Sequence, residues 1–291
     1  MKLHWKTSLC MTMLSLFVFI LSAAAAPNVS KPILIEGALG IETSTLVDGH
    51  QDASQQQIGG WTYTTGTLDG YPVVVCLTGE GGARAAAATA VGIERFHPYA
   101  VINQGTSGGN DPALHVYDIV LGRKSFDSSA WRSHPSEEGE GVDYKDIELR
   151  GTYDPTAGLR DPNSQIYYYA DQELLAAAHK AQTEYTRGSV VEGCINTSNS
   201  WNDQIDRILW LYHAYGASCE EMETNAAAQI CQEYHIPFVG IRIISNAALH
   251  HERYCPDTGT ACQEYVMRVV RCYVSDQKTP VRELLPHRRR I

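Results

Sequence analysis

One stretch near the carboxyl-terminal end restricts the fold more than any other, because it joins an amphipathic helix to a buried strand. The acidic run 220–223 is expected to open the helix, and small or apolar residues recur at helical spacing from 222 to 231. The run 236–241 is then continuously apolar, a pattern typical of a strand covered on both faces. A sheet covered on both faces needs helices in two layers, which favours a three-layer α/β fold.

The rest of the chain alternates between strand and helix patterns, which predicts a central mixed sheet with helices on both faces. Residues 125–164 are polar and are expected to form an exposed excursion. No internal repeat or linker divides the chain, so residues 27–291 are expected to form a single domain. Strands are predicted at 32–36, 61–67, 71–77, 100–104, 118–122 and 189–194, and helices at 83–96, 172–185, 205–215 and 266–274.

The amino terminus has the pattern of a secretory signal peptide over residues 1–26. Two lysines precede an apolar run from Leu9 to Leu21, and four alanines lead to Pro27. An uncleaved membrane anchor is the alternative, but this run is shorter than the roughly 20 residues that span a bilayer. We therefore expect a secreted or periplasmic protein with no stable membrane association once the signal is removed.

Charge and cysteine usage exclude several classes of function. The net charge of −10 argues against a nucleic-acid binder, which needs a positive surface. The short basic run 287–290 is expected to be a solvated end. No Cys-x-x-Cys motif occurs, so the sequence offers no support for a metal site. Cys255 and Cys262 flank a predicted turn and are the best candidates for a disulfide.

Two charged residues fall where a core is expected. Glu223 stands beside the predicted helix start, and Arg242 stands within the apolar run of the last predicted strand. Burying either charge would be costly unless it were paired or bound to a ligand. These positions are therefore candidates for a functional site.

Three blocks of sequence now give a resemblance to a known family. They are Gly37 to Glu42, Val101 to Gly109, and Glu221 to Ser245. Their order and spacing resemble those of the methylthioadenosine/S-adenosylhomocysteine nucleosidases, within the nucleoside phosphorylase and hydrolase superfamily. The resemblance runs from about residue 33 to about residue 274. It implies a partly closed sheet, a homodimer, and cofactor-free hydrolysis of adenosine-type ribonucleosides to base and ribose moiety.

The resemblance also implies roles for individual residues. Glu42 would activate the attacking water, with Thr106 helping to hold it and Arg242 completing the shell. Glu223 would accept the ribose hydroxyls as short charge-assisted bonds. Each residue also has a plain structural interpretation, such as a loop glutamate, an ion pair or a helix cap. The other residues implied in substrate binding are Met222 along the sugar, Trp201 over the base or anchoring a helix, and Ser245.

Asn246 is the main departure from the family pattern, which has an aspartate there that is thought to protonate N7 of the purine. An amide can donate a hydrogen bond to N7 but cannot protonate it. Asparagine recurs at the equivalent place in 6-oxopurine phosphorylases. The change is compatible with a preference for inosine or guanosine, with a slower enzyme, or with lost activity. His250 and His251 are nearby candidates for an acid.

Two other functions remain open at this point. Phosphorylases of the superfamily hold phosphate with arginines, but Asn103 occupies one such position, and Arg84 is the one nearby cation that could replace it. Because a carboxylate-lined pocket without a cation repels phosphate, hydrolysis is favoured over phosphorolysis. A non-catalytic storage-type relative is the other alternative, although such a protein has no need for Glu42, Glu223 and Arg242 together.

Overall fold

The computed structural model describes residues 31–141, 143, 147–150 and 165–278. The predicted signal peptide, the basic run 287–290 and much of the predicted polar excursion lie outside these ranges. Within the described part of the chain, no helix has the length and apolar character needed to cross a membrane.

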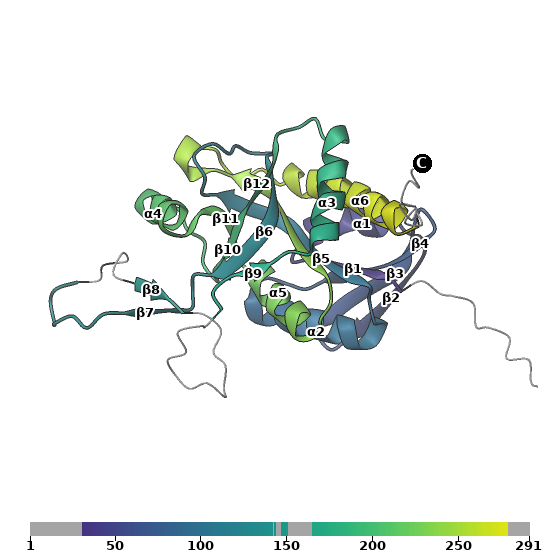
Figure 1. The fold of residues 1–291 in the computed structure, drawn as a ribbon, viewed down its shortest axis with the longest axis horizontal. Helices are drawn as coiled ribbons and strands as arrows, with labels where there is room; N and C mark the ends of the chain where they lie inside the picture. The colour runs from purple at the N-terminus through teal and green to yellow at the C-terminus, as the bar shows by residue number, and fades with distance from the viewer. Residues whose placement is uncertain (1–30, 142, 144–146, 151–164, 279–291) are drawn as a thin grey trace, which may run out of the picture.

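The centre of the molecule is a ten-stranded mixed sheet (Figure 1). Its neighbour order is β2-β3-β4-β1-β5-β12-β6-β10-β11, with the short β9 beside β6. Strand β11 also pairs with β5, so β5, β12, β6, β10 and β11 form a closed ring. The strands are β1 Ile33–Gly37, β2 Gln51–Ile58, β3 Trp61–Leu68, β4 Tyr71–Leu77, β5 Ala100–Gly109, β6 Ile119–Asp127, β9 Tyr168–Tyr169, β10 Val190–Thr197, β11 Ala217–Glu221 and β12 Phe238–Asn246.

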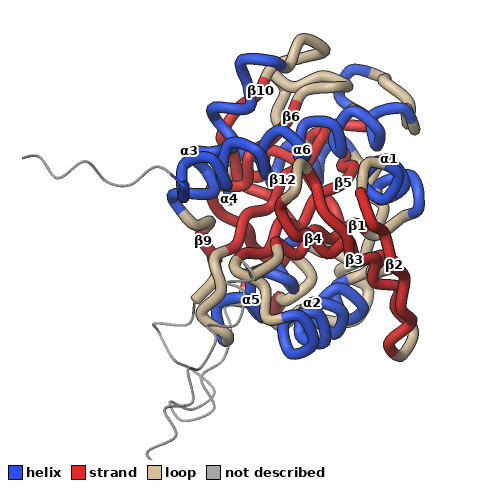
Figure 2. Tube along the Cα trace, turned by 90° about the vertical axis from the view of Figure 1, so that its right-hand side faces the viewer, coloured by secondary structure: helices blue, strands red, loops and turns tan. Residues whose placement is uncertain are grey.

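Helices cover both faces of the sheet, as predicted (Figures 1 and 2). Helices α1, α3 and α6 lie on one face, and α2 and α5 lie on the other. A small hairpin of β7 (Trp131–Ser133) and β8 (Ile147–Leu149) projects from the body. The helices are α1 Ser44–Asp48, α2 Gly82–Phe96, α3 Gln172–Ala181, α4 Ile205–Tyr215, α5 Thr224–Glu233 and α6 Asp257–Lys278.

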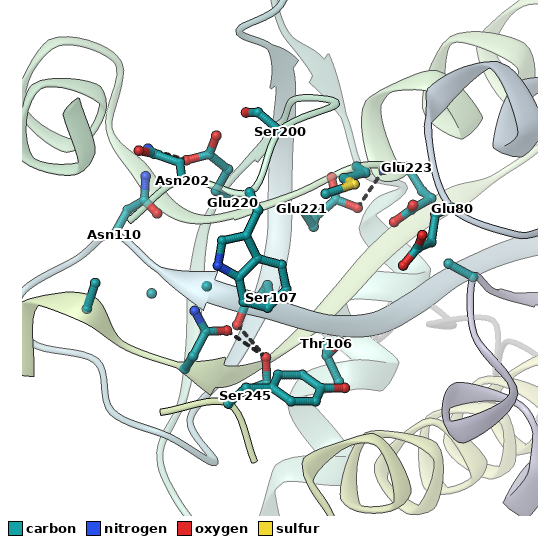
Figure 3. Close-up of a pocket in the computed structure, with 18 of the residues that line it drawn as sticks. Glu80, Thr106, Ser107, Asn110, Ser200, Asn202, Glu220, Glu221, Glu223 and Ser245 are labelled. Atoms are coloured by element: carbon teal, nitrogen blue, oxygen red, sulfur yellow. Dashed lines mark hydrogen bonds between the residues drawn. The ribbon is translucent and has the colours of Figure 1, made fainter. Parts of the chain in front are cut away.

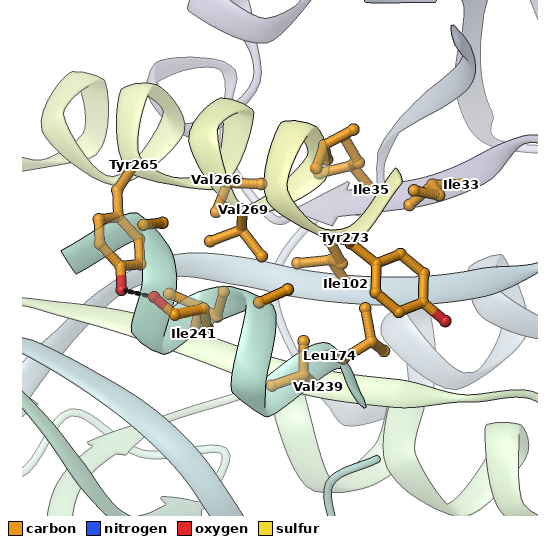
Figure 4. Packing of buried hydrophobic residues seen from close by; sticks show 14 of the residues in the cluster. Ile33, Ile35, Ile102, Leu174, Val239, Ile241, Tyr265, Val266, Val269 and Tyr273 are labelled. Carbon is orange, nitrogen blue, oxygen red and sulfur yellow. Dashed lines mark hydrogen bonds between the residues drawn. The ribbon is translucent and has the colours of Figure 1, made fainter. Parts of the chain in front are cut away.

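The alternation of side chains along the central strands explains the two helical layers. In β1, Ile33 and Ile35 belong to the core beneath α6, whereas Leu34 belongs to the opposite core beneath α2 and α5. Helix α6 returns an apolar stripe, including Tyr265, Val266, Val269 and Tyr273, onto the first core (Figure 4). The expected three-layer α/β/α fold with a mixed, partly closed sheet is confirmed.

The prediction that the acidic run 220–223 opens a helix is wrong. Glu220 and Glu221 end strand β11, and helix α5 begins only at Thr224. The run is extended because it pairs with β10 on one side and with β5 on the other. Strand β2, with its exposed polar residues, was also missed, because only one of its eight residues is a large apolar side chain.

The predicted disulfide is wrong, because Cys255 and Cys262 are both free thiols. The segment between them is not a turn, since residues from Asp257 onward are helical. Cys262 is buried in the core between α6 and the sheet, whereas the Cys255 sulfur lies 3.5 Å from the Tyr117 hydroxyl. The helix directs the two thiols to different surroundings.

Candidate active site

A cavity of about 380 Å³ opens where several strands of the sheet end. Strands β1, β4, β5 and β12 run parallel, so their carboxyl ends meet at this edge, which is the usual ligand side of such sheets. The polar side chains of the wall form two groups (Figure 3). We call them the Glu223 end, with Glu80, Thr106 and Glu223, and the Glu220 end, with Asn110, Asn202 and Glu220. Glu42 belongs to the Glu223 end, because it is hydrogen-bonded to Thr106.

Glu42 is held rigidly at the Glu223 end. It follows β1 in a short 3-10 turn, and its two carboxylate oxygens accept four hydrogen bonds. The Ala38 and Leu39 amides donate to Oε2 at 2.9 and 3.0 Å, and the Thr106 amide and hydroxyl both donate to Oε1 at 2.8 Å. A Cβ at Gly105 would come within 2.7 Å of Oε1, so only glycine fits there. Of the four donors, only the Thr106 hydroxyl can rotate away.

Arg242 lies behind the cavity wall and is 1% exposed. Its Nε and Nη2 donate to Glu221 Oε2 at 3.0 and 2.5 Å, and Nη2 also donates to Asn103 Oδ1 at 2.6 Å. Burial alone would raise the pKa of Glu221, but the Arg242 charge, together with hydrogen bonds from Arg242, Thr197 and the Thr224 amide, outweighs burial and holds that pKa below its ordinary value. Arg242 therefore forms a buried ion pair, which was the structural alternative to its predicted role beside the attacking water, and its carboxylate partner is Glu221.

Glu223 stands just before α5 and faces the cavity. Its Oε1 accepts a hydrogen bond from the Gly81 amide at 2.8 Å, and its Oε2 lies 3.8 Å from Arg242 Nη2. Burial, followed by the neighbouring Glu221 charge, raises the pKa of Glu223 to about 8. Its Oε2 lies beyond hydrogen-bonding distance of Arg242, so this oxygen is available to a hydroxyl group of a ligand.

Asn246 is the last residue of β12 and lines the cavity beside Ser245. The Ser245 hydroxyl lies 3.0 Å from Asn246 Oδ1 and 3.1 Å from the Ser107 carbonyl oxygen, so its one hydrogen is shared between these two acceptors (Figure 3). This contact orients the amide, and Asn246 Nδ2 keeps its hydrogens available for an acceptor on a ligand. The expected histidines lie further out, since His250 stacks on His115 and its ring nitrogen binds the Pro112 carbonyl.

Two aromatic residues border the mouth of the cavity. Trp201 precedes α4 and is 60% exposed, so it does not anchor that helix to the core. Tyr254 meets it edge-on, with ring centroids 6.1 Å apart. Met222 adds a flexible apolar side chain to the same cavity. The mouth therefore offers flat apolar surfaces for a planar ring.

Comparisons with known proteins bear on this geometry. Residues 32–273 match the model of the phosphorylase superfamily. A 5'-methylthioadenosine/S-adenosylhomocysteine nucleosidase of Bacillus cytotoxicus is 31% identical over 217 residues, which are 74% of this chain and 86% of the relative. The chain belongs to this nucleosidase family. The expectation of an N-glycosyl hydrolase is confirmed at the level of the family, whose similar members carry that name.

Solved structures of the nucleosidase family share the fold. The enzyme from Colwellia psychrerythraea, solved with adenine, is 26% identical and superposes with a TM-score of 0.68 over 84% of this chain and 96% of its own. The enzyme from Neisseria meningitidis, solved with methylthio-immucillin-A, is 23% identical, with a TM-score of 0.67 over 82% and 98%. A futalosine hydrolase of Helicobacter pylori has the same fold at 19% identity.

This member of the nucleosidase family has a strongly acidic cavity. Five glutamates line it, and none of its described lining residues is lysine, arginine or histidine. Arg84, the cation that could have held phosphate, is exposed on α2, and its Nε donates to the Thr78 carbonyl at 3.3 Å. Asn103 is occupied by its contacts with Glu36 and Arg242. The described lining therefore offers no charged donor that could hold a phosphate ion.

Most of the site residues predicted from the sequence line this one cavity, but several other lining residues were not predicted. Glu42, Thr106, Trp201, Met222, Glu223, Ser245 and Asn246 all line the cavity, whereas Arg242 lies behind it. The pairing of Glu221 with Arg242 could have been predicted, because a buried arginine requires a carboxylate partner and Glu221 lies in the same sequence block, Glu221 to Ser245. Tyr254, Asn110, Asn202 and Glu220 carried no such signal, since they come from separate loops and strand ends.

Proposed function

We propose that the chain hydrolyses the N-glycosidic bond of purine ribonucleosides, giving the free base and the ribose moiety. One observation carries the proposal: the rigidly held Glu42 and the available Glu223 carboxyl line one cavity, and none of its described lining residues is a cation that could hold phosphate. Methylthioadenosine and S-adenosylhomocysteine are the substrates named for the relatives, so adenosine-type nucleosides are the starting expectation.

Glu42 and Thr106 are proposed to hold and activate the attacking water. When the Thr106 hydroxyl rotates, Glu42 Oε1 becomes free to accept a proton from a water that this hydroxyl also contacts. The water oxygen then bonds to C1′ as the C1′–N9 bond breaks, and the electron pair of that bond enters the base. A general base of this kind typically contributes about 10²- to 10⁴-fold in rate.

Glu223 and Met222 are proposed to position the sugar. The ionised Glu223 carboxylate would accept the ribose hydroxyls and so distinguish ribosides from deoxyribosides. Arg242 acts from behind the wall, where its charge stabilises Glu221 and lowers the pKa of Glu223 from the value that burial alone would give. This places Arg242 in support of the carboxylates, and its contact with the attacking water is not required.

Trp201 and Asn246 are proposed to receive the base. An aromatic face stacks on a purine without regard to its substituents. Asn246 Nδ2, oriented through Ser245, would donate a hydrogen bond to N7 and so stabilise the negative charge that develops on the leaving base. The amide supplies no proton, so the base would take its proton from solvent after the bond breaks.

Release of free base with and without phosphate tests the proposal. The purified mature chain is incubated with adenosine, methylthioadenosine and inosine, in phosphate-free buffer and with added inorganic phosphate. We expect free base and free sugar at equal rates in both buffers. Release only with phosphate would indicate a phosphorylase, and no release from any nucleoside would favour the storage-type alternative.

Export and dimerisation remain predictions of the sequence, and we propose both for the native protein. The first predicts that the protein recovered from its host begins close to Pro27, which amino-terminal sequencing measures. The second predicts twice the mass of the mature chain in solution, which light scattering measures.

A further inference from the structure

The Glu220 end of the cavity carries polar groups for which the mechanism has no use. Glu220 and Asn110 are 9% and 1% exposed, yet both line the cavity. Asn202 Nδ2 donates to Glu220 Oε2 at 3.0 Å and so fixes the carboxyl group in place. Burying these polar groups costs free energy unless a ligand supplies the hydrogen bonds that they lack.

Two atoms of this group make no close hydrogen bond among the described residues, although the Asn110 side chain lies near enough to the Glu220 carboxyl to oppose the rise in pKa that burial causes. They are Glu220 Oε1, which is an acceptor, and Asn110 Nδ2, which is a donor. Asn246 Nδ2 adds a second donor near the same end of the cavity, since its Oδ1 already accepts from Ser245. The ligand edge that would satisfy these three groups has two acceptors followed by one donor.

The arrangement of the residues gives the order of these contacts. Ser245, which holds Asn246, lies on one side of the cavity, Glu220 and Asn202 lie on the other, and Asn110 lies at the end between them (Figure 3). In the proposed complex the sugar lies at the Glu223 end, so the far edge of the purine faces this group. Passing from Asn246 through Asn110 to Glu220, the edge meets a donor, a donor and then an acceptor.

We propose that the base of the preferred substrate is a 6-oxopurine, hypoxanthine or guanine, and that Glu220 is the residue that selects it. This inference rests on the proposed function. The oxopurine edge presents N7 and O6 as acceptors and N1–H as a donor, which match Asn246, Asn110 and Glu220 in that order. An ionised Glu220 accepts the N1 hydrogen through Oε1, the oxygen that lacks a protein partner.

Adenine fits the same groups less well. Its edge presents N7 as an acceptor, the 6-amino group as a donor and N1 as an acceptor. Asn110 Nδ2 would then face an amino group, and the Glu220 carboxylate would face the lone pair of N1. An asparagine reads adenine best by using its amide oxygen for the 6-amino group, but Asn246 Oδ1 is turned toward the Ser245 hydroxyl.

The substrate-side test needs only the wild-type protein. Values of kcat/KM are measured for inosine, guanosine, adenosine and 1-methylinosine, which lacks the N1 hydrogen. We expect inosine or guanosine to exceed adenosine by roughly 10- to 100-fold, and 1-methylinosine to lose a similar factor. A preference for adenosine, or equal rates for inosine and 1-methylinosine, would overturn the inference and leave the proposed hydrolysis intact.

The protein-side test uses Glu220→Gln with Glu80→Gln as its matched control. Glu80 is an exposed carboxylate at the opposite end of the cavity, so both variants lose one negative charge. We expect the inosine-to-adenosine ratio of kcat/KM to fall about tenfold in E220Q and to stay unchanged in E80Q. Equal shifts in both variants would indicate a general charge effect and refute the role of Glu220.

Binding of free bases separates this inference from the proposed function. Titration calorimetry with hypoxanthine and with adenine requires no turnover. If no nucleoside were hydrolysed, the proposed function would fail, but tighter binding of hypoxanthine would still support the reading of the base by Glu220. Tighter binding of adenine would refute it.

Discussion

The two ends of the cavity differ in how completely their polar groups are satisfied. At the Glu223 end, Glu42 accepts four hydrogen bonds and Glu221 is paired with Arg242. At the Glu220 end, Glu220 Oε1 and Asn110 Nδ2 have no partner among the described residues. The first end is pre-organised for chemistry without a ligand, whereas the second is completed only when a ligand arrives. Substitutions at the first end should change rates, and those at the second should change which base is accepted.

The largest expected effect is that of Glu42→Gln. We expect kcat/KM to fall about 10²- to 10⁴-fold, because an amide cannot take the proton of the attacking water. The fall should be similar for every purine riboside, in contrast to E220Q. Release of free base measures the rate, and an unchanged melting temperature is the control for folding. A variant that lost activity with one base alone would break the distinction between the two ends.

The buried ion pair behind the Glu223 end should dominate stability. Arg242→Met leaves the Glu221 carboxylate buried without its partner and should cost about 3–5 kcal/mol in the free energy of unfolding. Urea denaturation measures this loss. The double variant R242M/E221Q removes both charges and should recover part of it, and equal losses in the single and double variants would contradict the pairing.

Glu36 predicts a pH dependence of stability. Burial raises its pKa to about 7, with the Asn103 amide opposing the shift, so the folded protein holds this proton more tightly than the unfolded chain. The stabilisation is complete below about pH 4.5 and is lost as pH rises through 7, which amounts to about 3 kcal/mol. Glu36→Gln should lack this slope in urea denaturation at several pH values, whereas the exposed Glu233→Gln should retain it.

Glu223 gives the smallest predicted effect, on the pH profile of activity. Its pKa is raised to about 8, and only the ionised form accepts ribose hydroxyls strongly. Values of kcat/KM should therefore rise about tenfold per pH unit below this pKa and level off above it. Glu223→Gln should give a lower and flatter profile, and an unchanged profile would remove Glu223 from sugar binding.

The central fold could be predicted because its signals are local. Continuous apolar runs identified β1, β4, β5 and β12, and helical spacing identified α2, α5 and α6. Strand β11 could not be recognised in this way, because its residues Ala217–Glu221 carry few apolar side chains. What makes it a strand is pairing with β10 and with β5, and its β5 partners Gly108 and Gly109 lie more than 100 residues earlier in the chain, so this pairing has no local pattern.

That one missed strand explains most of what was missed in the site. Successive residues of a strand point to opposite sides, so Glu221 turns inward to Arg242 and Glu220 turns into the cavity. A helix would have left the two glutamates on neighbouring positions of one surface. Asn110 follows the β5 strand that closes on β11, and Asn202 precedes α4, so their meeting with Glu220 depends on the closed ring.

The five glutamates around the cavity have a consequence for nucleotides. A nucleotide carries a 5′-phosphoryl group, which brings at least one negative charge. Among the described lining residues, such a group would meet carboxyl groups and no lysine, arginine or histidine. The protein should therefore act on a purine nucleotide only after a phosphatase has removed the phosphoryl group.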